Sequence, residues 1–258
     1  MTESASPAPA QQTQSHSTGL APWAIMALAI VLPSIVTYVY FDLLSDVAPA
    51  IQQTAYSIGK TIQFLLPLVI VFAVNRESFR SSIVTSTDAK SKNWLVGGVA
   101  FGFLVVASMF VIYFAWLQHM HVGQKMLEAV QTKVQGMGLA SVWMFVGMGV
   151  FYALIHSLLE EYYWRWFVFR YLKRLVPTTI ANIISSLGFM AHHVMLLGFF
   201  LGWNEPLTYV FSLGIAVGGA VWAWIYDRTG SLVAPWISHM IVDAGIFALG
   251  YFLIKDIL

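Results

Sequence analysis

Long apolar runs separated by short polar links repeat along the chain. About seven runs are each close to the ~20 residues that a helix needs to cross the ~30 Å hydrocarbon core of a bilayer. They cover residues 20–41, 54–74, 94–117, 140–159, 178–199, 207–226 and 231–254. The period-two alternation of a β-barrel is not seen, so the pattern predicts an all-α, polytopic membrane bundle of seven to eight transmembrane helices.

Two segments outside the runs differ from each other in pattern. Residues 1–19 are rich in Ser, Ala, Gln, Thr and Pro and contain no Lys or Arg, which is typical of a disordered tail. The link at 118–139 has apolar residues at helical spacing, which predicts an amphipathic helix at the membrane interface. We therefore expect a tail, N-terminal transmembrane helices at 20–117, this interfacial link, and a transmembrane core at 140–258.

The positions of Lys and Arg predict the orientation, because basic residues gather in cytoplasmic links. If seven helices alternate, three links fall on one side, and they hold Arg76, Arg80, Lys90, Lys92, Arg170, Lys173, Arg174 and Arg228. That side is expected to face the cytosol. The N-terminus is then cytosolic and the C-terminus external, in the cell (inner) membrane.

The composition agrees with a membrane protein and excludes several classes of function. Apolar residues make up 59% of the 258 residues and charged residues 10%, with a mean hydropathy of +0.74. The absence of cysteine excludes disulfides, thiolate metal sites and cysteine nucleophiles. The 13 Lys and Arg nearly balance the 12 Asp and Glu and form no basic block, so nucleic acid is not an expected partner.

Three groups of ionisable residues lie within the predicted helices. A charge at the centre of a span costs at least ~2.5 kcal/mol, so such residues usually face the interior of the bundle and indicate function. The groups are Glu160, Glu161 and Arg165 at the end of the fourth run, His192 and His193 in the fifth, and His239 and Asp243 in the seventh.

The spacing within these groups predicts two pairs. Glu161 and Arg165 are four residues apart with the acid first, which favours a structural ion pair on one helical face. His239 and Asp243 are also four apart, so Asp243 can accept a hydrogen bond from one ring nitrogen and leave the other for a ligand or substrate.

Glu160 has no evident cation in its own helix and is surrounded by apolar residues. Burial disfavours the ionised carboxylate and suits a general base. The structural alternatives are that it pairs with Arg165 or with a histidine elsewhere. His156, one turn earlier, is either a supporting partner of Glu160 or a structural residue.

These groups predict a reaction class. A carboxylate base with imidazoles can activate water and stabilise the oxyanion of acyl hydrolysis. No Walker-type loop, Gly-x-Ser-x-Gly elbow or His-Glu-x-x-His motif occurs. Hydrolysis by a dispersed set of Glu and His residues is therefore the leading hypothesis.

Three short motifs at these positions resemble those of a known family. The segments Glu160-Glu161-Tyr-Tyr-Trp-Arg165, Phe189-Met-Ala-His-His193 and His239-Met-Ile-Val-Asp243 are similar to its Glu-Glu-x-x-x-Arg, Phe-x-x-x-His and His-x-x-x-Asn/Asp motifs. In this order on apolar helices they resemble the CPBP family, which comprises CAAX prenyl endopeptidases of the Ras-converting type and the Abi relatives. The resemblance covers residues 142–245.

The resemblance implies an intramembrane endopeptidase that cleaves near the membrane-embedded or lipidated end of a protein or peptide. Its expected partners are that substrate and the lipid bilayer. A prenylated CAAX tail, a leader peptide and a C-terminal sorting anchor all stay open as substrates. The alternatives are a non-proteolytic scaffold or bacteriocin self-immunity protein of the same fold, and a proton-coupled transporter.

The resemblance also implies the site residues: Glu160, His193, His239 and Asp243, supported by Glu161 and Arg165. The glutamate and the first histidine activate water, while the second histidine and the aspartate hold the oxyanion. His192 is not at the motif position and receives no role. We expect no cofactor; if the reaction depends on metal, zinc is expected, with Glu160, His193 and His239 as ligands.

Overall fold

The computed structural model describes residues 20–74, 89–138 and 141–256. The predicted tail at 1–19 and most of the basic link at 75–93 lie outside the described residues. The elements in chain order are α1 (Leu20–Tyr38), η1 (Val39–Leu43), α2 (Pro49–Leu68), η2 (Val69–Val74), α4 (Ala89–Ala115), η3 (Leu117–His119), α5 (His121–Gly136), α6 (Val142–Phe151), η4 (Tyr152–His156), α7 (Ser157–Glu161), η5 (Tyr162–Phe169), α8 (Arg170–Leu172), α9 (Thr178–Leu201), α10 (Pro206–Thr229) and α11 (Val233–Ile254).

Seven helical stretches in the described residues are long and apolar enough to cross a membrane, and no strand occurs there. They are Ala21–Leu43, Pro49–Ala73, Lys92–His119, Val142–Leu172, Thr178–Leu201, Pro206–Thr229 and Val233–Ile254. The fold is therefore the predicted all-α polytopic bundle of a multi-pass membrane protein. The fourth stretch continues to Leu172, because the apolar residues 166–168 extend the helix beyond the predicted run.

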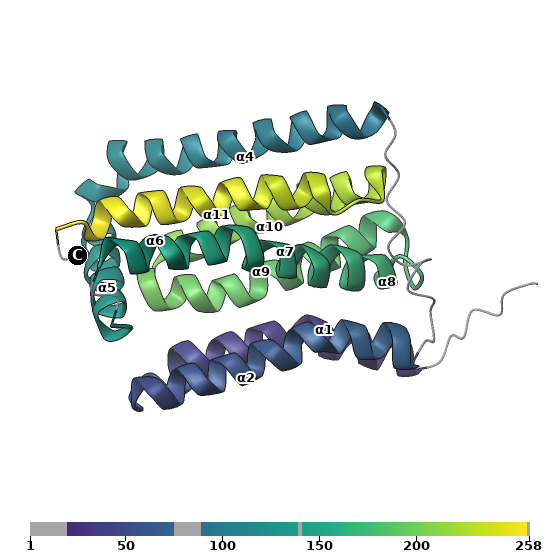
Figure 1. The fold of residues 1–258 in the computed structure, drawn as a ribbon, viewed down its shortest axis with the longest axis horizontal. Helices are drawn as coiled ribbons and strands as arrows, with labels where there is room; N and C mark the ends of the chain where they lie inside the picture. The colour runs from purple at the N-terminus through teal and green to yellow at the C-terminus, as the bar shows by residue number, and fades with distance from the viewer. Residues whose placement is uncertain (1–19, 75–88, 139–140, 257–258) are drawn as a thin grey trace, which may run out of the picture.

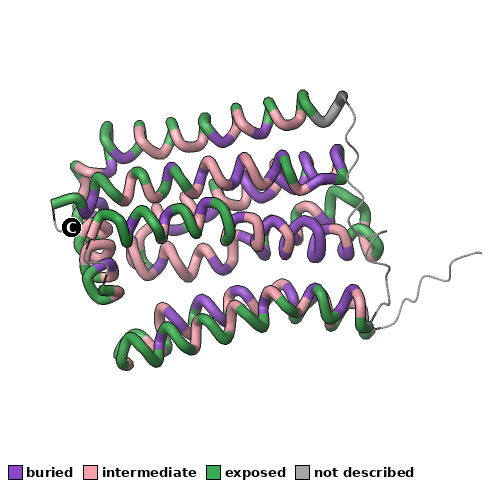
Figure 2. Tube along the Cα trace, viewed as in Figure 1, coloured by how far each residue is buried: buried purple, intermediate pink, exposed green. Residues whose placement is uncertain are grey.

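The spanning helices form layers, and α5 lies across one end of them (Figure 1). The pair α1 and α2 lies on one side and α4 on the other, with the helices from α6 to α11 between them. Within this middle part α9 packs closely with α10, while α11 packs closely against the outer helix α4. Buried residues concentrate in the middle helices, whereas α4 and the α1–α2 pair expose their outer faces (Figure 2).

Two glycines allow α4 to approach α11. A Cβ atom on Gly98 would lie 3.0 Å from the carbonyl oxygen of Ala234, and one on Gly102 would lie 2.9 Å from that of Ser238. Glycines four residues apart are a common means of close helix packing in membranes. The contact holds the first turns of α11, which carry His239, against α4.

The helix α5 forms where the sequence predicts an amphipathic helix. Its Val122 and Val134 are buried, and Met126, Leu127 and Val130 pack beside them. Their neighbours include Leu201 at the end of α9 and Leu253 at the end of α11. The apolar face of α5 therefore closes one end of the bundle.

Candidate active site

The first group of site residues lies on a helix with irregular hydrogen bonding. Glu160 and Glu161 end the short α7, which is preceded by the π-helical η4 and followed by the π-helical η5. An insertion of this type rotates the side chains that follow it relative to those of a regular helix, and such segments are frequent at functional sites. Both carboxylates point into the bundle and are buried, with 3% and 0% of their residue surface exposed.

Three imidazoles surround the carboxylate of Glu160. Nε2 of His192 lies 3.2 Å from Oε1, and Nε2 of His156 lies 3.9 Å from the same oxygen. Nε2 of His239 lies 3.8 Å from the other oxygen, Oε2. Helices that are far apart in the sequence thus converge on one carboxylate.

The hydrogen bonding of His193 fixes its tautomer. Its Nδ1 lies 2.8 Å from the carbonyl oxygen of Phe189, and a carbonyl can only accept, so Nδ1 carries the proton. In the neutral ring Nε2 is then an acceptor. His193 is half-buried, in contrast to the buried His192.

His192, to which the sequence motif gives no role, also reaches the site. Its ring stacks on Trp164, with the centroids 5.7 Å apart and the planes 5° apart. The side chains of consecutive residues on a helix, such as His192 and His193, point in directions about 100° apart. Donor atoms of Glu160, His192 and His193 nevertheless lie within 4.8 Å of one another.

The carboxylate of Glu161 joins Arg165 to His239. Its Oε1 lies 2.9 Å from Nη1 of Arg165 and accepts a hydrogen bond of 2.8 Å from Nδ1 of His239. Nη2 of Arg165 donates to the carbonyl oxygen of Gly219 at 3.3 Å, and its guanidinium lies 4.7 Å from the ring centroid of Phe189. The predicted ion pair of Glu161 and Arg165 is present, and it also orients a histidine.

The environment of His239 differs in one respect from the predicted pairing. Asp243 Oδ1 lies 3.5 Å from Nε2, whereas the shorter contact, at Nδ1, is made by Glu161. Trp222 stacks on the imidazole, with the centroids 4.2 Å apart and the planes 15° apart. Glu161 and Trp222 therefore hold the ring, and Nε2 faces the region between Glu160 and Asp243.

The structure adds one charged residue that the motifs do not include. Lys60 lies on α2 and interacts electrostatically with Glu160. The sequence contains the signal, a lysine within the second apolar run, but no motif marks it. Tyr56 on the same helix interacts electrostatically with Tyr152, which precedes the site on η4.

The donor set at Glu160 is of a type that can bind a metal ion. Two imidazoles and one carboxylate form a ligand set that zinc accepts in hydrolases. In the described residues this set is Glu160, His192 and His193. It differs from the expected set by containing His192 in place of His239, whose Nδ1 donates to Glu161.

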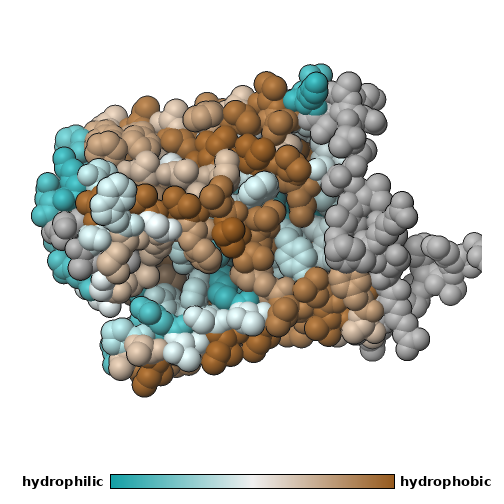
Figure 3. Space-filling view, viewed as in Figure 1, coloured by the Kyte–Doolittle hydropathy of each residue, from teal (hydrophilic) through white to brown (hydrophobic). Residues whose placement is uncertain are grey.

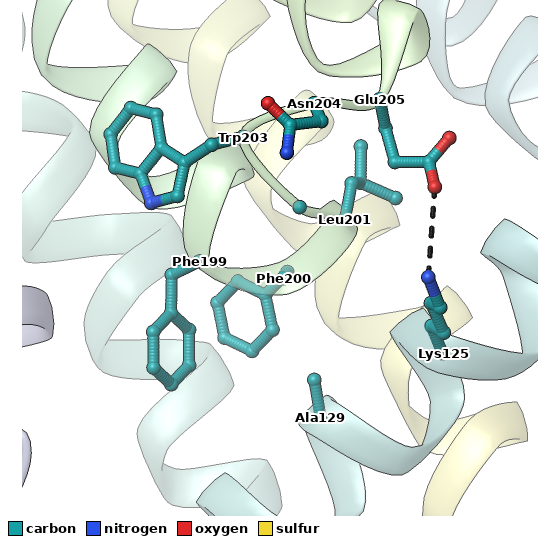
Figure 4. Close-up of a pocket in the computed structure, with 9 residues that line it drawn as sticks. Lys125, Ala129, Phe199, Phe200, Leu201, Trp203, Asn204 and Glu205 are labelled. Atoms are coloured by element: carbon teal, nitrogen blue, oxygen red, sulfur yellow. Dashed lines mark ion pairs between the residues drawn. The ribbon is translucent and has the colours of Figure 1, made fainter.

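A small cavity lies apart from these residues, at the end of α9. It encloses about 290 Å³ and is lined by the 199–205 segment together with Lys125 and Ala129 of α5. Lys125 and Glu205 form an ion pair of 3.7 Å at its edge (Figure 4). The cavity contains none of the site residues.

Part of the chain matches a known protein family. Residues 138–245 match the family model described as "Type II CAAX prenyl endopeptidase Rce1-like". No curated protein and no solved structure matches the chain. The matched range contains all three motifs and ends two residues after Asp243.

Proposed function

We propose that the protein is an intramembrane endopeptidase, because residues 138–245 match the model of the Rce1-like type II CAAX prenyl endopeptidase family. Its reaction is hydrolysis of a peptide bond near the membrane-embedded or lipidated end of a protein or peptide. The observation that carries the proposal is the buried carboxylate of Glu160, which lies 3.2 Å from one imidazole and 3.8 Å from another. Buried ionisable groups are costly in a membrane, and a purely structural bundle does not need them.

We assign the role of general base to Glu160. A water molecule bound between Glu160 and Nε2 of His193 loses a proton to the carboxylate as its oxygen attacks the substrate carbonyl carbon. The proton then passes from Glu160 to the leaving nitrogen as the carbon–nitrogen bond breaks. The products are a carboxylic acid and an amine, and the enzyme returns to its initial state.

His239 and Asp243 are proposed to stabilise the oxyanion. Nδ1 of His239 donates to Glu161, so Nε2 can donate to the developing negative charge only when the ring carries both protons, as an imidazolium beside the carboxylates of Glu161 and Asp243. An ionised Asp243 beside the oxyanion would repel it. Asp243 therefore acts either as a protonated donor or by orienting His239.

A metal-dependent form of the same hydrolysis is the second candidate, and the cluster of donor atoms at Glu160 favours it. Glu160, His192 and His193 would hold the ion, since their donor atoms lie within 4.8 Å of one another. A zinc ion in such a site supplies Lewis acidity and lowers the pKa of bound water. His239 keeps the same role toward the oxyanion in either form.

Peptide cleavage by the purified protein in detergent tests the function. The substrate is a peptide with a prenylated cysteine followed by three residues, compared between the wild type and Glu160→Gln. Glu128→Gln is the matched control, because Glu128 is exposed on α5 outside the site. Cleavage by the wild type and the control alone supports an endopeptidase. Absence of cleavage in all three proteins favours a scaffold. Absence of cleavage together with pH-dependent flux in vesicles favours a transporter.

We also propose that the N-terminus is cytosolic and the C-terminus external in the cell membrane, from the distribution of Lys and Arg. The chain has no cysteine, so a single introduced cysteine gives an unambiguous signal. Ser17→Cys is expected to resist a membrane-impermeant thiol reagent in whole cells, and Asp256→Cys to react. The reverse result would invert the orientation.

A further inference from the structure

A second cavity lies between α5, the link that leads into α2, and the end of α9. It encloses about 460 Å³, which is within the ~300–1,000 Å³ typical of ligand pockets. It is lined by residues of the 45–53 segment, by the part of α5 from Lys125 to Met137, and by Phe199. It contains none of the residues of the candidate active site.

This cavity lies at the level of the membrane interface. The first span ends at Leu43 and the second begins at Pro49, so the link between them lines the cavity where the chain turns. The helix α5 lies between the third and fourth spans, and Phe199 is in the last turn of the fifth. In Figure 3 hydrophilic side chains gather at the end of the bundle where Figure 1 places α5, next to the apolar sides of the spans. A ligand in this cavity is therefore at the depth of the lipid headgroups.

The ammonium of Lys133 lies among three aromatic rings beside the cavity. Its nitrogen is 4.1 Å from the ring centroid of Tyr40, 5.1 Å from that of Phe41 and 5.8 Å from that of Phe199. These rings belong to η1 and α9, so two elements besides α5 meet at this cation. Aromatic faces attract a cation and fix its position, but they provide no oxygen acceptor for its donors.

In the part of the chain that the structure describes, one acceptor lies within reach of the Lys133 ammonium. Oε1 of Gln52 is 3.5 Å from Nζ, and Gln52 is held because its Nε2 donates to the carbonyl oxygen of Tyr40 at 2.6 Å. No carboxylate among the described residues pairs with Lys133, whereas Lys125 pairs with Glu205 at 3.7 Å. Burial lowers the pKa of Lys133, because the ammonium is desolvated without a compensating anion.

The phosphate of a phospholipid is the anion that best fits this position. A lysine ammonium binds phosphate as a compact point charge, and phospholipids place their phosphates at this depth of the membrane. The hydroxyl of Thr132 lines the same cavity and can donate to a second phosphate oxygen. Along α2, Ile51, Ile58 and Ile62 expose more than half of their surface, which offers apolar contacts to the acyl chains.

We propose that the cavity beside Lys133 is a phospholipid-binding site in which the Lys133 ammonium holds the phosphate. Lys133 and Gln52 already join α5 to α2, and the bound lipid completes this junction at the membrane interface. The proposal does not depend on peptide cleavage, so it can fail or hold independently of the proposed function.

Lipid binding to the purified, delipidated protein in detergent tests this site. The probe is dioleoyl phosphatidylethanolamine, because the exposed Glu128 also lines the cavity and is compatible with the ammonium of that headgroup. The comparison lipid is dioleoylglycerol, which has the same acyl chains and no phosphate. Native mass spectrometry gives the affinity for the first bound molecule. Charge-assisted hydrogen bonds are strong, so the wild type is expected to bind the phospholipid at least ~10-fold more tightly.

Variants of two lysines identify the group that holds the phosphate. Lys133→Gln should remove the preference for the phospholipid, and Lys133→Arg should retain it. The matched control is Lys255→Gln, because Lys255 is exposed at the same end of the bundle, after α11, and does not line the cavity. This control should keep the wild-type preference. Equal affinity of the wild type for the two lipids would overturn the proposal, and so would a preference that persists in Lys133→Gln.

Inorganic phosphate distinguishes a lipid site from a site for a free anion. It is added in competition, at the concentration of the bound phospholipid. The lipid is expected to remain bound, because free phosphate lacks the apolar contacts of the acyl chains. Displacement of the lipid would show a free-anion site and would overturn the assignment to a phospholipid.

Photo-crosslinking of the wild type keeps the test independent of how well the variants fold. A phosphatidylethanolamine with a diazirine in its headgroup is expected to label peptides from α5 and from the 45–53 segment preferentially. Uniform labelling at both ends of the bundle would contradict a specific site beside Lys133.

Discussion

Nδ1 of His239 donates a hydrogen bond of 2.8 Å to Oε1 of Glu161, across 78 residues of sequence. The same oxygen lies 2.9 Å from Arg165, so one buried carboxylate connects a structural cation to a candidate catalytic imidazole. Because this contact fixes Nδ1 as the donor to Glu161, it directs Nε2 toward Glu160. The first and third motifs therefore form one unit in space.

Removing either partner of the Glu161–Arg165 pair should chiefly lower stability. Breaking a buried pair leaves an uncompensated charge, at a cost of ~3–5 kcal/mol. Glu161→Ala and Arg165→Ala are expected to give low folded yield and early thermal unfolding in detergent. Lys125→Ala is the control, because Lys125 forms an exposed ion pair with Glu205, and such pairs contribute ~0–1 kcal/mol. Normal yield and stability in both Ala variants would contradict the structural role.

Close packing of α4 on α11 should depend on Gly102. A Cβ there would lie 2.9 Å from the carbonyl oxygen of Ser238, so Gly102→Val forces the helices apart, at a cost of ~1–3 kcal/mol. The matched control is Gly97→Val, because a Cβ on Gly97 meets nothing within 4 Å. The thermal midpoint should fall in the first variant alone. Equal midpoints would show that α4 does not pack on α11 as described.

The negative charge of Asp243 should not be required for peptide cleavage. Asp243→Asn keeps the shape and can still donate or accept at His239, so it is expected to retain substantial activity with an altered pH profile. The control for loss of the oxyanion donor is His239→Gln, which should be strongly impaired. Complete inactivity of a well-folded Asp243→Asn protein would indicate that the negative charge itself takes part.

Replacing His192 and replacing His193 should lower the activity to different extents. If Glu160 is the base, His193→Ala removes the Nε2 acceptor that is proposed to hold the water, and it is expected to lower kcat by ~10²–10⁴-fold. His192→Ala removes one hydrogen bond to Glu160, worth ~0.5–1.5 kcal/mol, and should cost roughly 10-fold or less. Equal and complete loss in both variants, with loss of bound metal, would favour the metal-dependent form.

The helix count and the family motifs could be predicted from the sequence, because both depend on local pattern. Hydropathy alone finds seven spans, and each motif lies within one helix. The contact between Glu161 and His239 could not be predicted, because it depends on how two distant helices pack. His192 was assigned no role because it is not at the motif position, and only the packing of the helices shows that its donor atom lies within 4.8 Å of those of Glu160 and His193. Lys60 was missed because no motif marks it and because its electrostatic interaction with Glu160 depends on how two helices pack.

The π-helical segments around Glu160 could not be predicted from the sequence either. An apolar aromatic run such as residues 162–169 predicts a helix but not its hydrogen-bond register. That register sets the direction of the side chains in the fourth span, and hence the position of Arg165 relative to Glu161.

Cleavage of a defined prenylated peptide by Glu160→Gln and by chelator-treated wild type tests the central claim most directly. Glutamine keeps the shape of Glu160 and cannot accept a proton, so activity should fall by at least ~10²–10⁴-fold with the fold intact. The wild type should remain active after treatment with a strong chelator. Loss of activity on chelation, its return on adding zinc, and about one zinc per chain would contradict the glutamate mechanism.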